Sequence, residues 1–514
     1  MSVGAAAERL PAGDAASPRA PTLAVGPAET VPLAGSLTIV VPVADVGALG
    51  EELQRIDQAI KMEDDAPFAP IVGLHVARWV LLPARVRGQG IEAGPSLVMW
   101  LVFDGTHTDQ LTALVKQGRA LLDRVYVHCV GYPTGGDTAA VRGFLLRHAA
   151  CGPVAAYDGT PGRSLAIIRR QDELAAELAA VVRAGKATGL PNQHVFLEAQ
   201  RFVDGELQER KPELARFARQ RLVVPPPRWL PLDAAAEAGR VLRSAGNGVT
   251  LFVVLGLATV VLLGCLLGLA LSTAFGLTPF AAAVAVVVLL VLTPPALISL
   301  AAVLWVLLLW RTEAREALRW VPVSASEFKD HHEWLKQRDN EGPGMNRMTI
   351  LTDVKPGFMR HVMMHAVLGI IALRARRNLA GALQGVETIH FAEWRLVDGG
   401  RRLLFMSNYD GDALDYLFDF SHHAAPGVNA IWGNTEGFPP TRNLVGDGSR
   451  DVEPFQNAAR VHQIATDVWY CGYASRRFIT QRINGNWWIH EQLNAFPAPA
   501  EVDAWVETLE RRSA

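Results

Sequence analysis

The stretch from Ser244 to Trp310 contains no charged side chain in 67 residues, and no other feature constrains the chain as strongly. The hydrocarbon core of a bilayer requires about 20 apolar residues for each helical crossing. We therefore predict a two-helix transmembrane hairpin with crossings at 248–272 and 280–310. Arginines flank the run on both sides, so the positive-inside rule places both of its ends in the cytoplasm.

The predicted hairpin makes the chain a two-pass protein of the inner (cytoplasmic) membrane, with both termini and both globular parts in the cytoplasm. A buried core hairpin of a soluble domain is the alternative, but it does not account for the length of the run or its lack of charge. No ionisable side chain lies within the run, so we do not expect an ion-coupled carrier. The hairpin is predicted to anchor the protein in the lipid bilayer, and its glycines offer a surface for homo-oligomerisation.

Two segments on either side of the run show the same order of predicted elements, β-α-β-β-α-β, which is that of a ferredoxin-like unit. The first segment has its predicted strands at 36–43, 71–82, 96–103 and 124–133. A further short strand is predicted after it, at 153–159. The second segment has its predicted strands at 347–354, 387–397, 402–411 and 429–439.

Individual residues support an internal repeat. The window 104–133 aligns without a gap on 410–439, and six pairs are identical: Asp104/Asp410, Gly105/Gly411, Asp109/Asp415, Leu111/Leu417, Gly131/Gly437 and Pro133/Pro439. Outside this window, six further residues of each segment match: His75/His390, Ala77/Ala392, Trp79/Trp394, Tyr157/Tyr470, Gly159/Gly472 and Arg163/Arg476. We therefore predict an α+β fold in which two tandem ferredoxin-like repeats pair as a pseudo-dimeric barrel.

Composition divides the chain into segments and excludes some functions. We predict a disordered tail at 1–33, the first repeat with extra helices at 34–183, a helical connector at 184–243, the hairpin at 244–310, an amphipathic connector at 311–345, the second repeat with extensions at 346–495, and a C-terminal helix at 496–514. The formal net charge is −2, so the chain has no excess of positive charge that would favour nucleic acid as a partner. Four scattered cysteines fit neither a disulfide framework nor a zinc site, and we assign no metal site.

Positions that occur in only one repeat are better functional candidates than positions that both repeats share. The second repeat opens with Lys355 and Arg360 beside the start of a predicted helix, an arrangement that suits a carboxylate, a phosphate or a propionate. His361 and His365 are four residues apart on that helix, so they would share a face and could ligate haem iron. A solvated polar stripe on an amphipathic helix is the alternative.

Three further residues of the second repeat are catalytic candidates, namely His390, Asp410 and Arg476. Each has a counterpart in the first repeat, and each also has a structural interpretation. The aspartate stands at a strand end before glycine, which is typical of turns and helix caps. The histidine fits a hydrogen-bonded core position, and the arginine fits an ion pair.

Two successive ferredoxin-like units resemble the dimeric α+β barrel superfamily, which includes dye-decolourising peroxidases and chlorite dismutase-like haem proteins. The peroxidases carry a GxxDG signature. This chain keeps the Asp-Gly pair at Asp104 and Asp410, with Leu101 and Ser407 at the position of the first glycine. The resemblance implies two sheets around a cavity and haem as a candidate cofactor, and we transfer no catalytic residue from it.

Two functions are consistent with these observations. The first is an oxidoreductase, either haem-dependent and peroxidase-like or cofactor-independent, that acts on a peroxide or a lipophilic substrate. The alternative is a non-catalytic protein that binds a lipid or another small ligand, or that docks a partner. The chain has no Walker loop, GxGxxG, HExxH or usable GxSxG motif, so the enzyme classes that these motifs mark lose their support.

Overall fold

The computed structural model describes most of the chain outside the uncharged run. The described residues are 29–30, 34–62, 67–88, 90–150, 155–223, 303–375, 385–473, 480–495 and 497–512, with single positions between 273 and 281. They form two compact units. The smaller unit takes its residues from Met1–Thr30, Arg170–Val223 and Asn486–Ala514, and the larger unit from Val31–Arg169 and Val224–Gly485.

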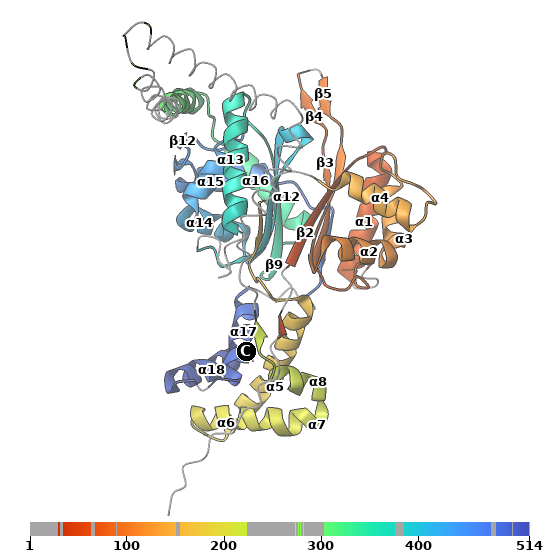
Figure 1. Cartoon of the computed structure of the whole chain (residues 1–514), viewed down its shortest axis with the longest axis vertical. Helices are drawn as coiled ribbons and strands as arrows, with labels where there is room; N and C mark the ends of the chain where they lie inside the picture. The colour runs from red at the N-terminus through yellow and green to blue at the C-terminus, as the bar shows by residue number, and fades with distance from the viewer. Residues whose placement is uncertain are drawn as a thin grey trace, which may run out of the picture. The chain divides into compact units, whose positions relative to one another are not determined.

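Two four-stranded antiparallel sheets form the centre of the larger unit (Figure 1). The first sheet has the order β14 (Val468–Cys471), β3 (Leu74–Leu82), β6 (Ser96–Asp104) and β2 (Ala34–Pro42). The second has the order β7 (Ala155–Asp158), β10 (Ile389–Val397), β11 (Arg402–Asp410) and β9 (Met345–Asp353). Each sheet therefore takes three strands from its own repeat and the fourth strand from the other repeat.

The exchanged strands correct the prediction of two separate ferredoxin-like repeats. Tyr157 of β7 pairs with Ala392, and Tyr470 of β14 pairs with Ala77. The segments 124–133 and 429–439, predicted as fourth strands, begin instead in helices. These are α3 (Arg119–Tyr126) and α15 (Ala425–Trp432). The buried residues of α3 recur at helical spacing, and they are Leu121, Leu122, Val125 and Tyr126.

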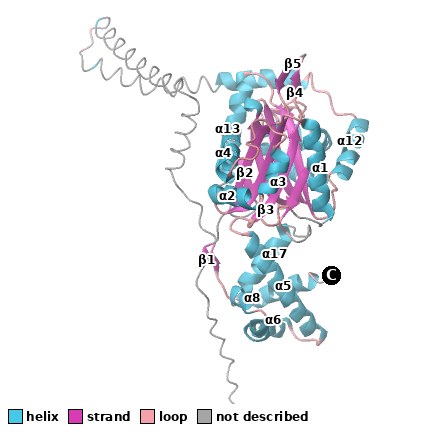
Figure 2. Cartoon of the chain, turned by 90° about the vertical axis from the view of Figure 1, so that its right-hand side faces the viewer, coloured by secondary structure: helices cyan, strands magenta, loops and turns pink. Residues whose placement is uncertain are grey.

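Helices cover the outer face of each sheet, and the two inner faces pack against each other (Figure 2). The first sheet is covered by α1 (Val46–Met62), α2 (His107–Gln117), α3 and α4 (Thr138–His148). The second is covered by α13 (Phe358–Ala375), α14 (Ala413–His423), α15 and α16 (Val452–Val461). Further elements include α12 (Ala325–Arg338) and two ribbons, β4 (Arg85–Arg87) with β5 (Gly90–Ala93) and β12 (Thr441–Arg442) with β13 (Gly446–Asp447).

Side chains from both sheets fill most of the space that a barrel would enclose. Along β6, Met99 and Leu101 contact the helices while Val98 and Trp100 face the other sheet, as the alternation of a strand requires. Leu404 of β11 belongs to the same inner cluster. The inner faces therefore form a packed core, with one hollow left at an edge.

A buried carboxylate holds the second sheet to the first. Glu393 of β10 is 0% exposed. It accepts hydrogen bonds from the Thr38 hydroxyl, from Ser36 Oγ at 2.5 Å and from Trp100 Nε1 at 3.0 Å. Arg395 on the same strand donates to it at 2.7 Å. Each of these donors is itself buried or half-buried, so the carboxylate satisfies polar groups that water does not reach freely.

Arg78, at the position of the first repeat that corresponds to Glu393, makes the reciprocal connection. It is completely buried and donates to oxygens of Met348, Thr349, Ser407 and Asn408 in the second sheet. Burial, with the neighbouring Arg347 guanidinium, lowers the pKa of Arg78 to about 9. The two sheets are thus joined by a buried carboxylate and a buried guanidinium. Each of them is hydrogen-bonded to the sheet that does not contain it.

The prediction of a transmembrane hairpin, and with it the placement in the inner membrane, is not supported. Among the described residues, no helix combines the length and the apolar composition that a membrane crossing requires. The described end of the second predicted crossing continues into a helix at 303–317, in which charged residues begin at Arg311. The crossing predicted at 248–272, most of that at 280–310, and the tail at 1–28 lie outside the described residues.

The smaller unit is helical and includes part of the predicted connector and the C-terminal helix. Its helices are α5 (Leu165–Ala187), α6 (Asn192–Phe202), α7 (Gln208–Arg210), α8 (Pro212–Ala218), α17 (Thr480–Leu493) and α18 (Pro499–Arg511), of which α5 and α17 begin in the larger unit. A short parallel pair joins β1 (Glu29–Thr30) to β8 (Leu222–Val223). Trp505 is fully buried and packs edge-on against Phe196, with ring centroids 5.0 Å apart.

A buried histidine makes the stability of the smaller unit depend on pH. His490 Nε2 donates to the Phe217 carbonyl at 3.1 Å, and Gln171 lies 3.3 Å from Nδ1. Burial lowers the pKa of His490 to about 4, whereas an unfolded histidine titrates near 6.5. The unfolded chain therefore binds the proton first as pH falls, so stability is complete above about pH 6.5 and decreases toward pH 4.

We expect the free energy of unfolding of the smaller unit to fall by up to about 3 kcal/mol over that range. Hydrogen exchange of peptides from 170–223 and 486–512, corrected for intrinsic rates, measures this change. His490→Gln keeps a donor for the Phe217 carbonyl but does not titrate, so it should flatten the profile between pH 4 and 6.5. If the stability of this variant depends on pH as strongly as that of wild type, the effect comes from another titratable group.

Candidate functional site

Each repeat contains a buried histidine that is bonded to the aspartate ending the adjacent strand. His75 Nε2 lies 2.9 Å from Asp104 Oδ1, and His390 Nε2 lies 2.6 Å from Asp410 Oδ1. The second oxygen of each carboxylate accepts a hydrogen bond from a backbone N–H at the start of a helix. Asp104 accepts from Leu165, and Asp410 accepts from Thr480. The structure thus brings the candidates His390 and Asp410 together, in an arrangement that both repeats share and that fixes strand ends to helix starts.

The two pairs differ in what faces the remaining ring nitrogen. His75 Nδ1 is 2.9 Å from the Tyr473 hydroxyl. In the other half the residue corresponding to Tyr473 is Thr160, and neither its hydroxyl nor His390 Nδ1 has a partner within the described residues. The phenol, imidazole and carboxylate thus form a continuous hydrogen-bonded chain. However, His75 is 0% exposed and Tyr473 5%, so this chain of groups belongs to the core.

Lys355 and Arg360 do come together, but they surround a carboxylate of the chain itself. Lys355 Nζ lies 2.8 Å from Glu316 Oε2, and Arg360 Nη2 lies 2.7 Å from the same oxygen. The two cations also donate to the Gly433 carbonyl and to Asn434 Oδ1. Glu316, from the helix that follows the uncharged run, therefore occupies the place of the predicted anion.

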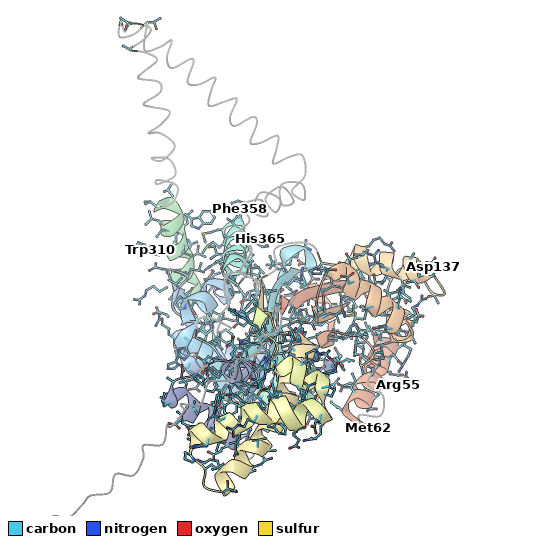
Figure 3. The ribbon with its side chains drawn as sticks, turned by 60° about the horizontal axis from the view of Figure 1, so that its bottom comes forward. Arg55, Met62, Asp137, Trp310, Phe358 and His365 are labelled. Carbon is cyan, nitrogen blue, oxygen red and sulfur yellow. The ribbon has the colours of Figure 1, made fainter. Side chains whose placement is uncertain are left out.

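His361 and His365 lie on α13 and make only local hydrogen bonds. The Nδ1 atom of each faces the backbone carbonyl four residues earlier, at 3.2 and 2.8 Å. Figure 3 shows His365 at the end of the larger unit that also carries Phe358 and Trp310, two exposed aromatic side chains. No group of three or more His, Cys, Asp and Glu side chains suited to a metal occurs in the described parts of the chain, and Arg476 lies outside them.

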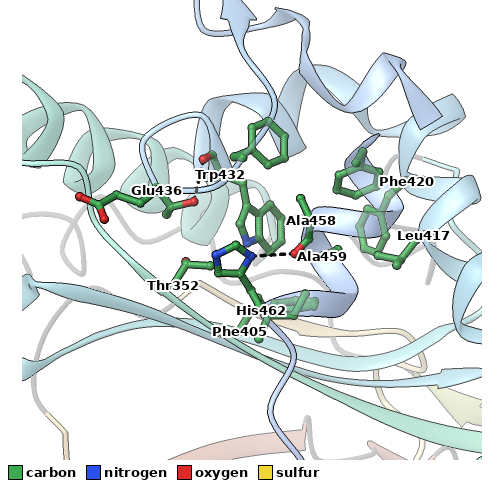
Figure 4. A pocket seen from close by; sticks show the side chains of 13 residues that line it. Thr352, Phe405, Leu417, Phe420, Trp432, Glu436, Ala458, Ala459 and His462 are labelled. Atoms are coloured by element: carbon green, nitrogen blue, oxygen red, sulfur yellow. Dashed lines mark hydrogen bonds between the residues drawn. The ribbon is translucent and has the colours of Figure 1, made fainter. Parts of the chain in front are cut away.

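A hollow of about 20 Å³ lies in the helical layer over the second sheet (Figure 4). Strands β9 and β11 provide its floor, and α14, α16 and the turn 432–438 surround it. Its apolar lining is formed mainly by Ile350, Phe405, Leu417, Phe420, Trp432, Phe438 and Phe455. Its mostly apolar lining with a few polar groups resembles that of small-molecule sites, and its volume is close to what one water molecule needs.

The register of the strands defines the equivalent place in the first repeat. Ile39 of β2 pairs with Met99, and Ile350 of β9 pairs with Phe405. The bridge partners that follow α4 and α16 are also equivalent, because Ala149 pairs with Ile39 and Gln463 pairs with Ile350. Counting back from these bridges matches Phe144 with Ala458, Leu145 with Ala459 and His148 with His462.

Side chains of the first repeat fill the space that is open in the second. Phe144 is fully buried, with its ring centroid 5.9 Å from that of Tyr126 and 5.2 Å from that of Tyr132. The corresponding residues of the second repeat, Trp432 and Phe438, line the hollow together with Ala458. The hollow therefore exists where the second repeat has two alanines in place of a phenylalanine and a leucine.

Polar residues also distinguish the hollow from its filled counterpart. Thr352 stands where the first repeat has Val41, and Glu436 stands where it has Val130. Thr352 is 5% exposed, and its hydroxyl has no partner in the described structure. Glu436 is exposed at the rim. The second repeat has thus gained polar groups at the same place where it has lost volume.

A second hollow, of about 100 Å³, lies between the two sheets at one edge. Ser36 and Trp100 line it, but both already bond to Glu393. Asp158 also lines it, and burial raises the pKa of this carboxyl group. This edge space is what remains of the cavity that the resemblance to barrel proteins implied.

Comparisons with known protein families, with curated proteins and with solved structures find no match to this chain. The site must therefore be argued from its geometry. Sequence reasoning missed Ala458, Ala459, Thr352 and His462. A signal was present in the repeat, because extending the alignment to 141–148 and 455–462 matches His148 with His462 and exposes both alanine replacements.

Proposed function

We propose that the second repeat binds a small, largely apolar molecule in the hollow between β9, β11 and α14–α16. This is the non-catalytic ligand-binding hypothesis, in preference to the oxidoreductase. The observation that carries it is the replacement of Phe144 and Leu145 by Ala458 and Ala459 at equivalent places of one fold. Both repeats must build the same helix-on-sheet layer, yet only the first closes it with a phenylalanine and a leucine at these two places.

An unfilled apolar hollow lowers stability, by about 24 cal/mol for each Å³ of cavity in measured core truncations. The second repeat offsets much of its lost volume, with Phe405, Phe420, Trp432 and Phe455 where the first repeat has Met99, Leu114, Tyr126 and Val141. A ligand that occupies the remaining space would restore the missing contacts and stabilise the folded state by mass action. Retaining the hollow is thus consistent with an occupant that is not part of the chain.

Filling the hollow should abolish binding. Small neutral aromatic and aliphatic compounds are first screened by ligand-observed NMR. We expect Ala458→Phe, which restores the residue of the first repeat, to weaken the binding of each hit at least about tenfold because the new ring occupies the ligand's space. Calorimetric titration of wild type and variant measures the change.

Two further variants make the result specific. Ala459→Leu restores the other residue of the first repeat and should also weaken binding, which protects the test against misfolding of a single variant. Ala504→Phe introduces the same ring at an exposed position of α18 and should leave affinity unchanged. Equal affinity of wild type, Ala458→Phe and Ala459→Leu, or the absence of any hit, would refute the proposal.

A further inference from the structure

The hollow between the two sheets has a counterpart at the opposite edge of the larger unit, because the two halves of the fold are equivalent. It lies where β2 and β7 form the edges of their sheets, and β9 and β14 form the corresponding edges. The strand registers match Ser36 with Arg347 and Ala156 with Trp469. The two places can therefore be compared residue by residue.

Two large side chains fill the counterpart. Arg347 and Trp469 are buried, with 2% and 3% of their surfaces exposed, and the guanidinium carbon lies 4.9 Å from the ring centroid of the tryptophan. The Nη2 atom of the same arginine is 3.6 Å from Asp339 Oδ1. The chain thus places its own guanidinium between an indole and a carboxylate, both of which are favourable partners for this group.

The edge with the hollow carries smaller side chains at several of these places. The inward-facing residues that are reduced in size are Ala34, Ser36 and Ala156, in place of Met345, Arg347 and Trp469. Trp100 and Phe391 are larger than their counterparts, Met406 and Val76, and offset part of this loss. The space that remains is about 100 Å³, about two-thirds of a core cavity that accommodates benzene. It therefore has room for a group of about four non-hydrogen atoms.

Asp158 supplies a carboxylate to this hollow, where the other edge has the thiol of Cys471. Its Oδ1 accepts a hydrogen bond from the Thr160 N–H at 2.8 Å. Within the described part of the chain, no lysine or arginine forms an ion pair with this carboxylate, and the charge of Arg163 acts on it only at longer range. Burial raises the pKa of Asp158, because the charged form lacks a partner that would stabilise it.

The other charged groups near the hollow are already bonded. Arg395 donates to Glu393 at 2.7 Å, and Arg78 donates to carbonyl oxygens of the second sheet. No lysine or arginine is among the described residues that line the hollow. An incoming ligand therefore meets the carboxylate of Asp158, which attracts a cation and repels an anion.

We infer that this hollow binds the guanidinium group of a small molecule, with Asp158 as its carboxylate partner and Trp100 and Phe391 as its apolar walls. The group is planar, fits the available space and forms paired hydrogen bonds to a carboxylate. The rest of the ligand extends toward solvent, since Ser36 and Asp158 are only half-buried. The inference does not rest on the proposed function, because the two hollows lie on opposite faces of the second sheet.

Methylguanidinium and methylurea test the inference, because they share a shape and differ in charge. We expect the full-length protein to bind methylguanidinium at least about tenfold more tightly than methylurea at neutral pH, as a charge-assisted hydrogen bond in a half-buried site predicts. Molecules of this size bind weakly, with a Kd of about 1 mM. Ligand-observed NMR titration measures both affinities in this range.

Three variants locate the binding. Asp158→Asn keeps an acceptor for the Thr160 N–H but removes the charge, so it should weaken methylguanidinium binding about tenfold and leave methylurea binding unchanged. Ala156→Trp restores the residue of the other edge and should weaken the binding of both probes. Asp45→Asn makes the same change at an exposed aspartate that also accepts a backbone N–H, and it should have no effect.

The inference and the proposed function can fail separately. Absence of methylguanidinium binding, equal affinity for the two probes, or full affinity in Asp158→Asn would overturn the inference. So would binding that survives Ala156→Trp, or an equal loss in Asp45→Asn, because each would place the cation elsewhere on the protein. None of these results affects the apolar hollow, which Ala458→Phe and Ala459→Leu test with neutral compounds.

Discussion

Replacing Glu393 with alanine is expected to lower the free energy of unfolding of the larger unit by about 3–5 kcal/mol, the usual effect of removing one partner of a buried charged network. The change would leave Trp100 Nε1 and the Thr38 hydroxyl without their carboxylate. It would also leave the buried Arg395 guanidinium without its counter-charge. Urea unfolding of the full-length protein measures the effect.

Two controls separate this network from general effects of losing a carboxylate. Glu51 is exposed and pairs with Arg55 on α1, so Glu51→Ala should change stability by less than about 1 kcal/mol. Glu393→Gln keeps an acceptor but loses the charge, and its effect should be intermediate. If Glu393→Ala behaves like Glu51→Ala, the polar contacts do not hold the sheets together and the apolar inner cluster is sufficient.

The importance of Glu393 could not have been anticipated from sequence, because its partners are supplied by the other repeat. Thr38 and Glu393 are separated by 355 positions, and no local pattern specifies that they meet. The same limit applies to the exchanged strands. Both β7 and β14 are only four residues long, and their pairing with the opposite half depends on how the repeats assemble. The internal repeat itself was recoverable, since it depends on side chains that recur in order.

Local patterns also misled at two places for identifiable reasons. The β-branched stretch around Val125 suggested a strand, but its apolar residues have helical spacing and α3 forms. Lys355 and Arg360 suggested an anion site, and they do cluster, but Glu316 from a distant part of the chain neutralises them. A cluster of charges predicts an opposite charge, and sequence alone does not say whether a ligand or the chain supplies it.

Truncating Phe144 to alanine should reproduce in the first repeat the hollow that the second repeat already has. The ring is fully buried between Tyr126 and Tyr132, so we expect the free energy of unfolding to decrease by about 3–5 kcal/mol, as for other buried phenylalanines. Urea unfolding of Phe144→Ala measures this loss. The second repeat tolerates an alanine at the same place, which indicates that the variant can fold.

The same variant tests whether the hollow arises from the missing ring. If it does, a neutral compound that the screen finds should stabilise Phe144→Ala more than wild type, because a second apolar site contributes its own binding term. Adding Ala458→Phe to Phe144→Ala should close the original site and leave the new one. The double variant should then bind one molecule of the same compound, in the first repeat. Phe144→Ala could instead lower the free energy of unfolding by less than about 1 kcal/mol and create no new binding. Neighbouring side chains would then have collapsed into the space. In that case the two alanines would not explain the hollow of the second repeat.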